Sequence, residues 1–272
     1  MEQSILKRWR SSAVSAKADK QPEDDLVGRT IVGVPFESPH PLTSLILDQH
    51  ENGETSEPAL NQKLFKVRLA DNEGRRNKAS MLVKKMYAWR GYKIAWNARH
   101  QPNRITLVAS HGASPMATIS IGFDSPTGLL VDELYKPEVD ALRARGARLC
   151  EFTKLAVDGA IRSKRVLAAL FHISYIYSHR LNDFTDLLFE VNPRHVRFYE
   201  QLLGCKQYGP ERHNARVNAP AVLLHLEGSH VTEQIKRFGG QPEKARAEKS
   251  LFPYFFSEAE ERGIMGRLIK LT

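Results

Sequence analysis

The sequence predicts an α/β fold in which helices flank a mixed central sheet. Short runs with the two-residue alternation of strands recur along the chain, and segments with helical spacing of apolar residues separate most of them. Hydrophobic residues make up 42% of the 272 residues, which supports a substantial core. The predicted strands are residues 63–70, 105–110, 116–123, 149–157, 185–191 and 219–226. The predicted helices are residues 75–92, 132–145, 165–180 and 193–203.

The first half of this pattern consists of a strand, a helix and a hairpin. Residues 63–70 alternate between polar and apolar side chains, and residues 75–92 space their apolar side chains as an amphipathic helix does. Residues 111–115 form a turn containing Gly112 and Pro115 between two alternating runs. We therefore expect a β-hairpin there.

The second half contains a strand, a capped helix and another strand. Residues 185–191 form a short apolar run typical of a buried strand. Asn192 can accept a hydrogen bond from an amide of the next turn, and Pro193 suits the first helical position. Gly204 stands where a left-handed residue ends a helix. These limits give Tyr199 a defined place on the helix.

Three parts are expected along the chain. Residues 1–60 lack periodicity and are rich in polar residues, Pro and Gly, so they predict a flexible or loosely docked extension before a domain at residues 61–228. In residues 229–272 an aromatic cluster at 251–256 precedes Ser257, which stands three residues before a Glu as in a capping box. We expect a helical tail packed on the domain. An exposed cluster would instead contact a partner or a membrane surface.

The net charge of +9 is concentrated between residues 61 and 104, where twelve basic residues face two acidic ones. An acidic carrier protein, an anionic membrane or a nucleic acid would fit this charge, but no nucleic-acid-binding motif is evident. The alternative is a basic face that only contacts solvent. The residues expected to bind a partner lie on the predicted helix and are Arg75, Lys78, Lys84 and Lys85.

The composition also indicates the cellular location and whether disulfides or metal sites are expected. No apolar run reaches the roughly 20 residues of a membrane span, and no secretory signal is expected, so the predicted location is the cytoplasm. Cys150 and Cys205 are too few for a disulfide framework and are expected in the core. The ten histidines lack metal-ligand spacing, so no metal is expected.

Glu151 is the candidate general base. It lies in the middle of the strand at 149–157, where alternation puts it on the same face as Thr153 unless a bulge interrupts the pleat. Transfer of an acyl group to an amine requires a group that removes the ammonium proton, and a partly desolvated carboxylate can do this. Alternatively, Glu151 orients a backbone amide or pairs with Lys154 or an arginine.

These segments resemble known acyltransferase families. The strand and helix around Asn192 and Tyr199 are similar to the carboxyl-terminal motif of GNAT-type N-acyltransferases. Residues 151–156 (Glu-Phe-Thr-Lys-Leu-Ala) resemble a strand of acyl-homoserine-lactone synthases. Together with residues 132–143, 191–199 and 251–256, they resemble N-acyl amino acid synthases of the FeeM type over roughly residues 63–270. The resemblance implies a GNAT-like fold and transfer of a fatty acyl group from acyl carrier protein to the α-amine of an amino acid.

The resemblance also implies roles around the thioester. Tyr199 would protonate the departing thiolate, and Asn192 would bind the pantetheine arm. Backbone amides near Leu155 and Val157 would stabilise the oxyanion, because splaying of the strand would free a donor. The alternative roles are a buried core aromatic for Tyr199 and a helix cap for Asn192, and the cap does not exclude contact with the arm.

The predicted phosphate-binding loop departs from ordinary acetyltransferases. Those enzymes use a glycine-rich turn whose amides approach the pyrophosphate of coenzyme A, whereas residues 162–167 contain no glycine. Arg162, Lys164 and Arg165 would assist the helix start in holding one phosphate. This favours a carrier-bound donor over acyl coenzyme A, with no dissociable cofactor beyond its phosphopantetheine. A solvated basic turn is the alternative.

Three other functions stay open. The first is an acyl-homoserine-lactone-like synthase with S-adenosylmethionine as acceptor. The second is an acyl-coenzyme-A-dependent N-acetyltransferase. The third is a non-enzymatic module of the same fold that binds acyl chains or nucleic acid and turns nothing over.

Overall fold

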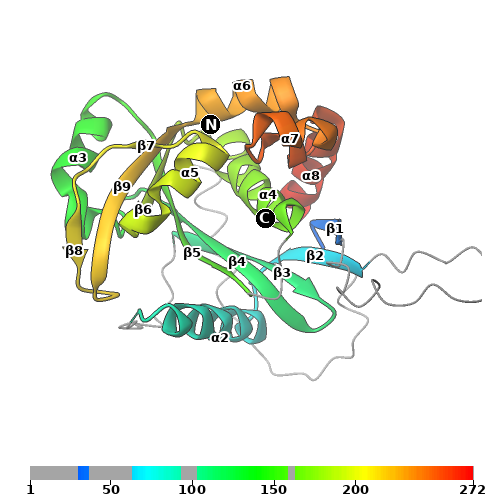
Figure 1. Ribbon diagram of the computed structural model, residues 1–272, viewed down its shortest axis with the longest axis horizontal. Helices are drawn as coiled ribbons and strands as arrows, with labels where there is room; N and C mark the ends of the chain where they lie inside the picture. Colours follow the sequence, from blue (N-terminus) through cyan, green and yellow to red (C-terminus); the bar gives the residue numbers. More distant parts are fainter. Residues whose placement is uncertain (1–29, 37–62, 93–102, 159–162, 272) are drawn as a thin grey trace, which may run out of the picture.

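The computed structural model describes residues 30–36, 63–92, 103–158 and 163–271. It has the predicted α/β architecture, with helices on both faces of a mostly antiparallel sheet (Figure 1). The strands are β1 (Val32–Phe36), β2 (Lys63–Leu69), β3 (Arg104–His111), β4 (Ser114–Phe123), β5 (Leu149–Val157), β6 (Asp186–Val191), β7 (Lys206–Gln207), β8 (Arg212–Asn214) and β9 (Ala219–Glu227). The larger helices are α2 (Glu73–Trp89), α3 (Asp132–Ala144), α4 (Lys164–Tyr175), α5 (Val196–Leu203), α6 (Gly228–Phe238) and α8 (Glu258–Leu271).

Short helical segments join these elements. A π-helix (Ile176–Arg180) continues α4, and a 3-10 turn (Pro193–His195) precedes α5. Gly204 ends α5 in the left-handed conformation with φ 75°. The helix limits expected from Pro193 and Gly204 are therefore confirmed. In the tail, a 3-10 turn (Pro242–Lys244), α7 (Ala245–Glu248) and a second 3-10 turn (Phe252–Tyr254) connect α6 to α8.

The sheet has the order β1-β2-β3-β4-β5-β6-β9-β7, with β8 paired to β9. Among the described strands, β5 and β6 form the one parallel pair. Helices α2 and α3 cover one face: α2 packs Leu82 and Met86 against Ala156 of β5, and α3 packs on Leu149 and Leu188. The opposite face contains the main core, in which α4 and the tail cover the sheet. Both faces of the sheet centre are thus buried.

Part of the expected amino-terminal extension belongs to the sheet. Val32–Phe36 pairs antiparallel with β2, and Ile31 just before it is fully buried. An isolated edge segment with alternating small apolar residues gave too weak a signal to be separated from the polar sequence around it. The rest of residues 1–60 lies outside the described residues. No helix among the described residues is long and apolar enough to cross a membrane.

The tail packs into the main core. Leu251, Phe252 and Phe255 are buried, and the Leu251 amide donates to the Leu202 carbonyl of α5 over 3.0 Å. Ser257 and Glu260 exchange the hydrogen bonds of a capping box at the start of α8. The aromatic cluster is therefore covered by the protein itself.

Candidate active site

The site is a point in the sheet where two neighbouring strands separate. The parallel ladder between β5 and β6 ends at the pair Glu151 and Leu188. Beyond it, β5 continues to Val157 along β4, while β6 continues to Val191 along β9. Figure 1 shows the two strands diverging. Each strand keeps one hydrogen-bonded neighbour and has no strand partner on the other side in the described part of the chain.

A β-bulge in β5 lies within this opening. Thr118 of β4 is opposite Ala156 and Ser120 is opposite Thr153, so Lys154 and Leu155 face a single residue of β4. Lys154 has a positive φ of 53°. The extra residue reverses which face of the sheet each later side chain of β5 points to. Ala156 therefore packs against α2, whereas unbroken alternation would put it on the same face as Phe152. The simple alternation assumed from the sequence therefore holds only up to residue 153.

The amides expected to meet the oxyanion lie on the open side of β5. The Asp158 amide donates to the Met116 carbonyl of β4 over 2.8 Å. Successive amides of a strand point to opposite sides, so the amides of Leu155 and Val157 point away from β4 and toward the gap. This geometry makes both amides suitable donors to a group placed between β5 and β6.

Glu151 is fully engaged in the structure. Its side chain is 2% exposed and forms an ion pair with Arg104, whose side chain is 9% exposed. The Leu130 and Val131 amides donate to its two oxygens over 3.1 and 3.0 Å. A carboxylate with these partners orients the loop before α3 and neutralises a buried guanidinium. These contacts are those of the alternative role given to Glu151 above, and its role as a base stays a prediction.

A second glutamate, Glu190, stands on β6 beyond the last β5 partner. Arg216 donates to its two oxygens over 2.9 and 2.8 Å, and Asn214 donates to one of them. Burial raises the pKa of Glu190, although Arg216 and Asn214 act in the opposite direction and Glu151 adds to the rise. A carboxylate with a raised pKa at the opening binds a proton more readily than an ordinary surface glutamate.

Tyr199 reaches the same region from the other face. Its ring packs on Phe171 and Phe189, with centroids 6.3 and 5.4 Å away. Burial raises its pKa, and Tyr87 of α2 contributes to the rise, so the two hydroxyls lie within electrostatic reach. Burial likewise raises the pKa of Tyr87 to about 12. Both hydroxyls stay protonated at neutral pH and can donate a hydrogen bond or a proton.

Lys154 adds a positive charge to the opening. Its pKa is lowered to about 8, mainly by burial and also by Arg104, while Glu151 acts in the opposite direction. Its positive φ places the side chain where an unbroken strand would not. At pH 7 it is therefore mostly protonated, next to the strand edge that β6 leaves open.

The residues expected to bind the donor do not form one cluster in the described part of the chain. Asn192 accepts from the Arg194 amide over 3.2 Å and donates to the Pro220 carbonyl over 3.2 Å, so it caps the helix as expected. Arg162 lies outside the described residues. Arg165 is half-buried in the first turn of α4, whereas Lys164 is exposed and lines a pocket.

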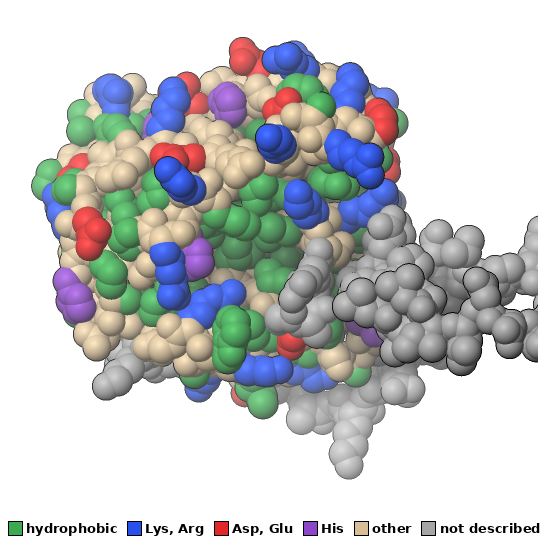
Figure 2. All heavy atoms as spheres, viewed as in Figure 1, with side chains coloured by type: hydrophobic (Ala, Val, Ile, Leu, Met, Phe, Trp, Pro, Cys, Tyr) green, Lys and Arg blue, Asp and Glu red, His purple; other side chains and the backbone are tan. Residues whose placement is uncertain are grey.

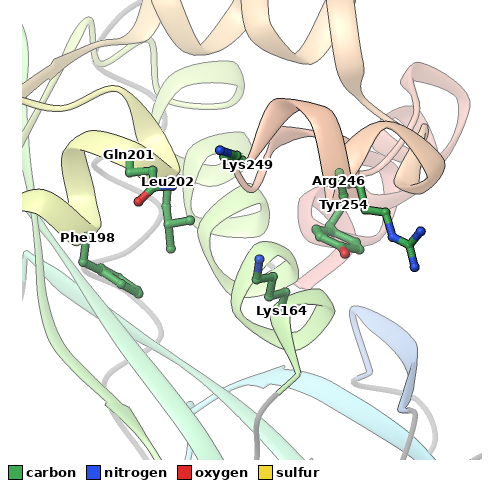
Figure 3. Close-up of a pocket in the computed structure, with 8 residues that line it drawn as sticks. Lys164, Phe198, Gln201, Leu202, Arg246, Lys249 and Tyr254 are labelled. Carbon is green, nitrogen blue, oxygen red and sulfur yellow. The ribbon is translucent and has the colours of Figure 1, made fainter.

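This pocket of about 470 Å³ lies between α4, α5 and the tail. In Figure 2 apolar side chains cover the centre of this face, and Lys and Arg side chains surround them. Figure 3 shows Phe198 and Leu202 on α5, Lys164 on α4 and Lys249 on the tail. The pocket is lined by Lys164, Phe198, Gln201, Leu202, Ala245, Arg246, Lys249 and Tyr254.

The comparisons with known proteins identify the family. The family model of FeeM N-acyl amino acid synthases matches residues 78–227, more than half of the chain. The chain belongs to the FeeM family. It is therefore an N-acyltransferase, as the sequence predicted. A search of curated protein sequences finds no match.

Solved structures that the chain resembles include FeeM. FeeM, an N-acyl amino acid synthase from uncultured soil microbes, is 30% identical with a TM-score of 0.56, covering 60% of this chain and 91% of FeeM. The acyl-homoserine-lactone synthase LasI is 14% identical with a TM-score of 0.43, covering 60% and 90%. An acyl-coenzyme-A N-acyltransferase from Pseudomonas aeruginosa is 11% identical with a TM-score of 0.41, covering 58% and 97%.

The basic helix of this FeeM-family enzyme is partly engaged. Arg75 pairs with Asp71, and Lys78 reaches the Ala113 carbonyl at 3.5 Å. Lys85 pairs with Asp158 over 3.1 Å at the end of β5. Lys78, Lys84 and Lys85 are exposed. The exposed apolar residues Met81 and Trp89, 69% and 75% accessible, share the helix with them.

Several residues at the candidate site of this FeeM-family member were not predicted from the sequence. Glu190 and Arg216 are 26 residues apart and meet only because β6 and β9 pair. Lys154 was considered as an ion-pair partner, but the bulge that places it at the opening leaves no mark in an alternating pattern. Lys249 and Arg246 come from the tail, where the aromatic cluster gave the stronger signal. Only Glu190 had a usable signal, as a carboxylate at the end of a buried strand.

Proposed function

We propose that this N-acyltransferase moves an acyl chain from a phosphopantetheine thioester, carried by acyl carrier protein, to the α-amine of an amino acid. The observation that carries the proposal is the opening between β5 and β6, which has different chemistry on its two sides. The face of α4 and α5 offers a pocket and the Tyr199 hydroxyl. The face of α2 and α3 offers Lys154 and Glu190.

The donor fits the first of these faces. A pantetheine arm is an extended amide chain, and the amides of Leu155 and Val157 point toward the gap, where the thioester carbonyl would accept from them. Tyr199 lies on the same face with a raised pKa, and it is suited to protonate the thiolate as it departs. The absence of glycine from residues 162–167 supports a single phosphate over a nucleotide pyrophosphate.

An amino acid fits the second face because it carries two opposite charges. Lys154 is the positive group for its carboxylate, and Glu190 is the negative group for its amine. A partly buried carboxylate with a raised pKa can take the ammonium proton, directly or through water. Glu151 and Arg104 hold the loop before α3 that borders this face.

The reaction then follows from these positions. The ammonium of the acceptor gives a proton to Glu190, and the neutral amine attacks the thioester carbon. The negative charge on the carbonyl oxygen is stabilised by amide donors of β5. When the intermediate collapses, the C–S bond breaks, the C–N bond remains, and the sulfur takes a proton from Tyr199. The nitrogen gives up its second proton in the same step, and this proton passes through water to Tyr199 and restores its hydroxyl, while Glu190 returns the first proton to solvent. The products are an N-acyl amino acid and a free thiol.

Charge complementarity supports a carrier protein as the source of the donor. Lys85 pairs with Asp158 at the end of β5, and Lys164 begins α4 six residues later. The basic side of α2 and the mouth of the pocket therefore border the same end of β5. An acidic carrier protein docked there would place its arm at the pocket while it contacts Lys84 and Lys85.

The direct test is turnover by the purified protein. Acyl carrier protein thioesters and the matching acyl coenzyme A are each supplied with a mixture of amino acids or with S-adenosylmethionine, and the products are analysed by mass spectrometry. We expect N-acyl amino acids, with the carrier-bound donor preferred. A lactone product would replace the proposed acceptor, and binding without turnover would contradict the proposal.

A matched pair of variants tests the acceptor site. Lys154→Met should lower kcat/KM for the amino acid about 10–100-fold, the effect of one hydrogen bond to a charged group. It should leave kcat/KM for the corresponding amino acid amide nearly unchanged, because the amide has no carboxylate. Lys270→Met, on the exposed side of α8, is the control. Equal loss for both acceptors would show that Lys154 does not recognise the carboxylate.

A further inference from the structure

The tail forms one wall of the pocket, although it lies outside the part of the chain that the family model matches. The match ends at residue 227, and the tail supplies Ala245, Arg246, Lys249 and Tyr254 to the lining. The other lining residues come from α4 and α5. Half of the lining therefore comes from the matched segment and half from the tail beyond it.

The lining divides into an apolar side and a basic side. Phe198 and Leu202 of α5 face the space from one side, and Phe198 is 39% exposed. Figure 3 shows Lys164 on α4 and Lys249 on the tail beside the same space, while the Arg246 guanidinium points outward, away from both lysines. None of the eight lining residues is acidic. A ligand that carries a negative charge on an uncharged chain matches this arrangement.

The position of Lys249 is fixed by the tail around it. Two residues later, the Leu251 amide donates to the Leu202 carbonyl over 3.0 Å, and the Leu251 side chain is fully buried. Lys249 itself has a positive φ of 59°, a conformation that costs a residue with a Cβ about 1 kcal/mol or more. The backbone at Lys249 is thus held close to α5 by the chain itself.

We propose that Lys249, with Lys164, binds the phosphate of a phosphopantetheine group, and that Phe198 and Leu202 contact its uncharged arm. The inference rests on the proposed function and assigns the tail a part in it. Lysine binds phosphate as a point charge, and several of them can share its oxygens. Lys164 opens the helix that follows β5, so an arm held here leads toward the amides of Leu155 and Val157.

The binding test uses 4′-phosphopantetheine and pantetheine as probes in isothermal titration calorimetry with the full chain. The variant is Lys249→Asn, since asparagine tolerates a positive φ and the change removes the charge and shortens the side chain while keeping it polar. We expect the Kd for phosphopantetheine to rise about tenfold, with the Kd for pantetheine unchanged. Lys236→Gln, an exposed lysine of α6 away from the pocket, should change neither. An unchanged Kd for phosphopantetheine in Lys249→Asn would overturn the proposal.

A kinetic comparison separates the sources of the phosphate. Lys249→Asn should raise KM for acyl carrier protein and for acyl coenzyme A by similar factors, because both carry phosphopantetheine. A rise for the carrier alone would assign Lys249 to a protein contact, and a rise for coenzyme A alone would assign it to the nucleotide; either result would overturn the inference. If no thioester gives an amide product, the proposed function fails, while the calorimetric result still decides whether the pocket binds the phosphate.

Discussion

The substitution Glu151→Gln should destabilise the protein strongly. Glutamine keeps the shape but removes the charge opposite Arg104, whose side chain is 9% exposed, and it can offer only one acceptor oxygen to Leu130 and Val131. Breaking a buried ion pair from one side costs about 3–5 kcal/mol. At roughly 2–4 °C per kcal/mol for a domain of this size, Tm should fall by about 6–20 °C.

Thermal unfolding followed by circular dichroism measures this fall, and a double-mutant cycle assigns it to the pair. Arg104→Met and Glu151→Gln together should be less destabilising than the sum of the single changes by about 0.5–3 kcal/mol. Gly122→Ala gives an independent check, because a Cβ there would lie 2.8 Å from both side chains of the pair. If Glu151→Gln keeps the wild-type Tm yet loses turnover, Glu151 is the base and the reasoning above is refuted.

Three further predictions concern the donor, the tail and the carrier. Tyr199→Phe should keep Tm within about 1 °C and lower kcat about 10²–10⁴-fold; unchanged kcat would make Tyr199 a packing residue. Burial lowers the pKa of His172 below its usual 6.5, so the unfolded chain binds the proton first. Tm should therefore fall as pH drops below about 6.5, and less so in His172→Phe; equal slopes would contradict this. Charge reversal of Lys84 and Lys85 should raise KM for acyl carrier protein while sparing acyl coenzyme A, an effect that salt should reproduce in the wild type.

Local chemistry made the fold largely predictable from the sequence. Asn192, Pro193 and Gly204 set the limits of a helix through hydrogen bonding and φ, and these depend on neighbours in the chain. Alternation placed Glu151 on the face it occupies, because the bulge comes after it. The family followed from several such local segments in the right order.

The site itself was less predictable because its contacts are long-range. Glu151 is 47 residues from Arg104 and 20 or 21 residues from the amides it accepts, so nothing near it in the sequence shows that its oxygens are engaged. Lys154 moves to the opening through a bulge that depends on pairing with β4. Lys249 enters the pocket only because Leu251 is anchored to α5.

The two glutamates explain how the opening persists without a ligand. Strands that separate leave amides unpaired, and the sheet would gain hydrogen bonds by closing. Glu151 ties β5 to Arg104 of β3 and to the loop before α3, whereas Glu190 ties β6 to Arg216 and Asn214 near β9. The Arg216 guanidinium also donates to the Leu130 carbonyl over 3.1 Å, so the same loop is held from both strands. Each strand is fixed to its own side, and in the proposed reaction the amides of β5 that face the gap are the donors to the thioester.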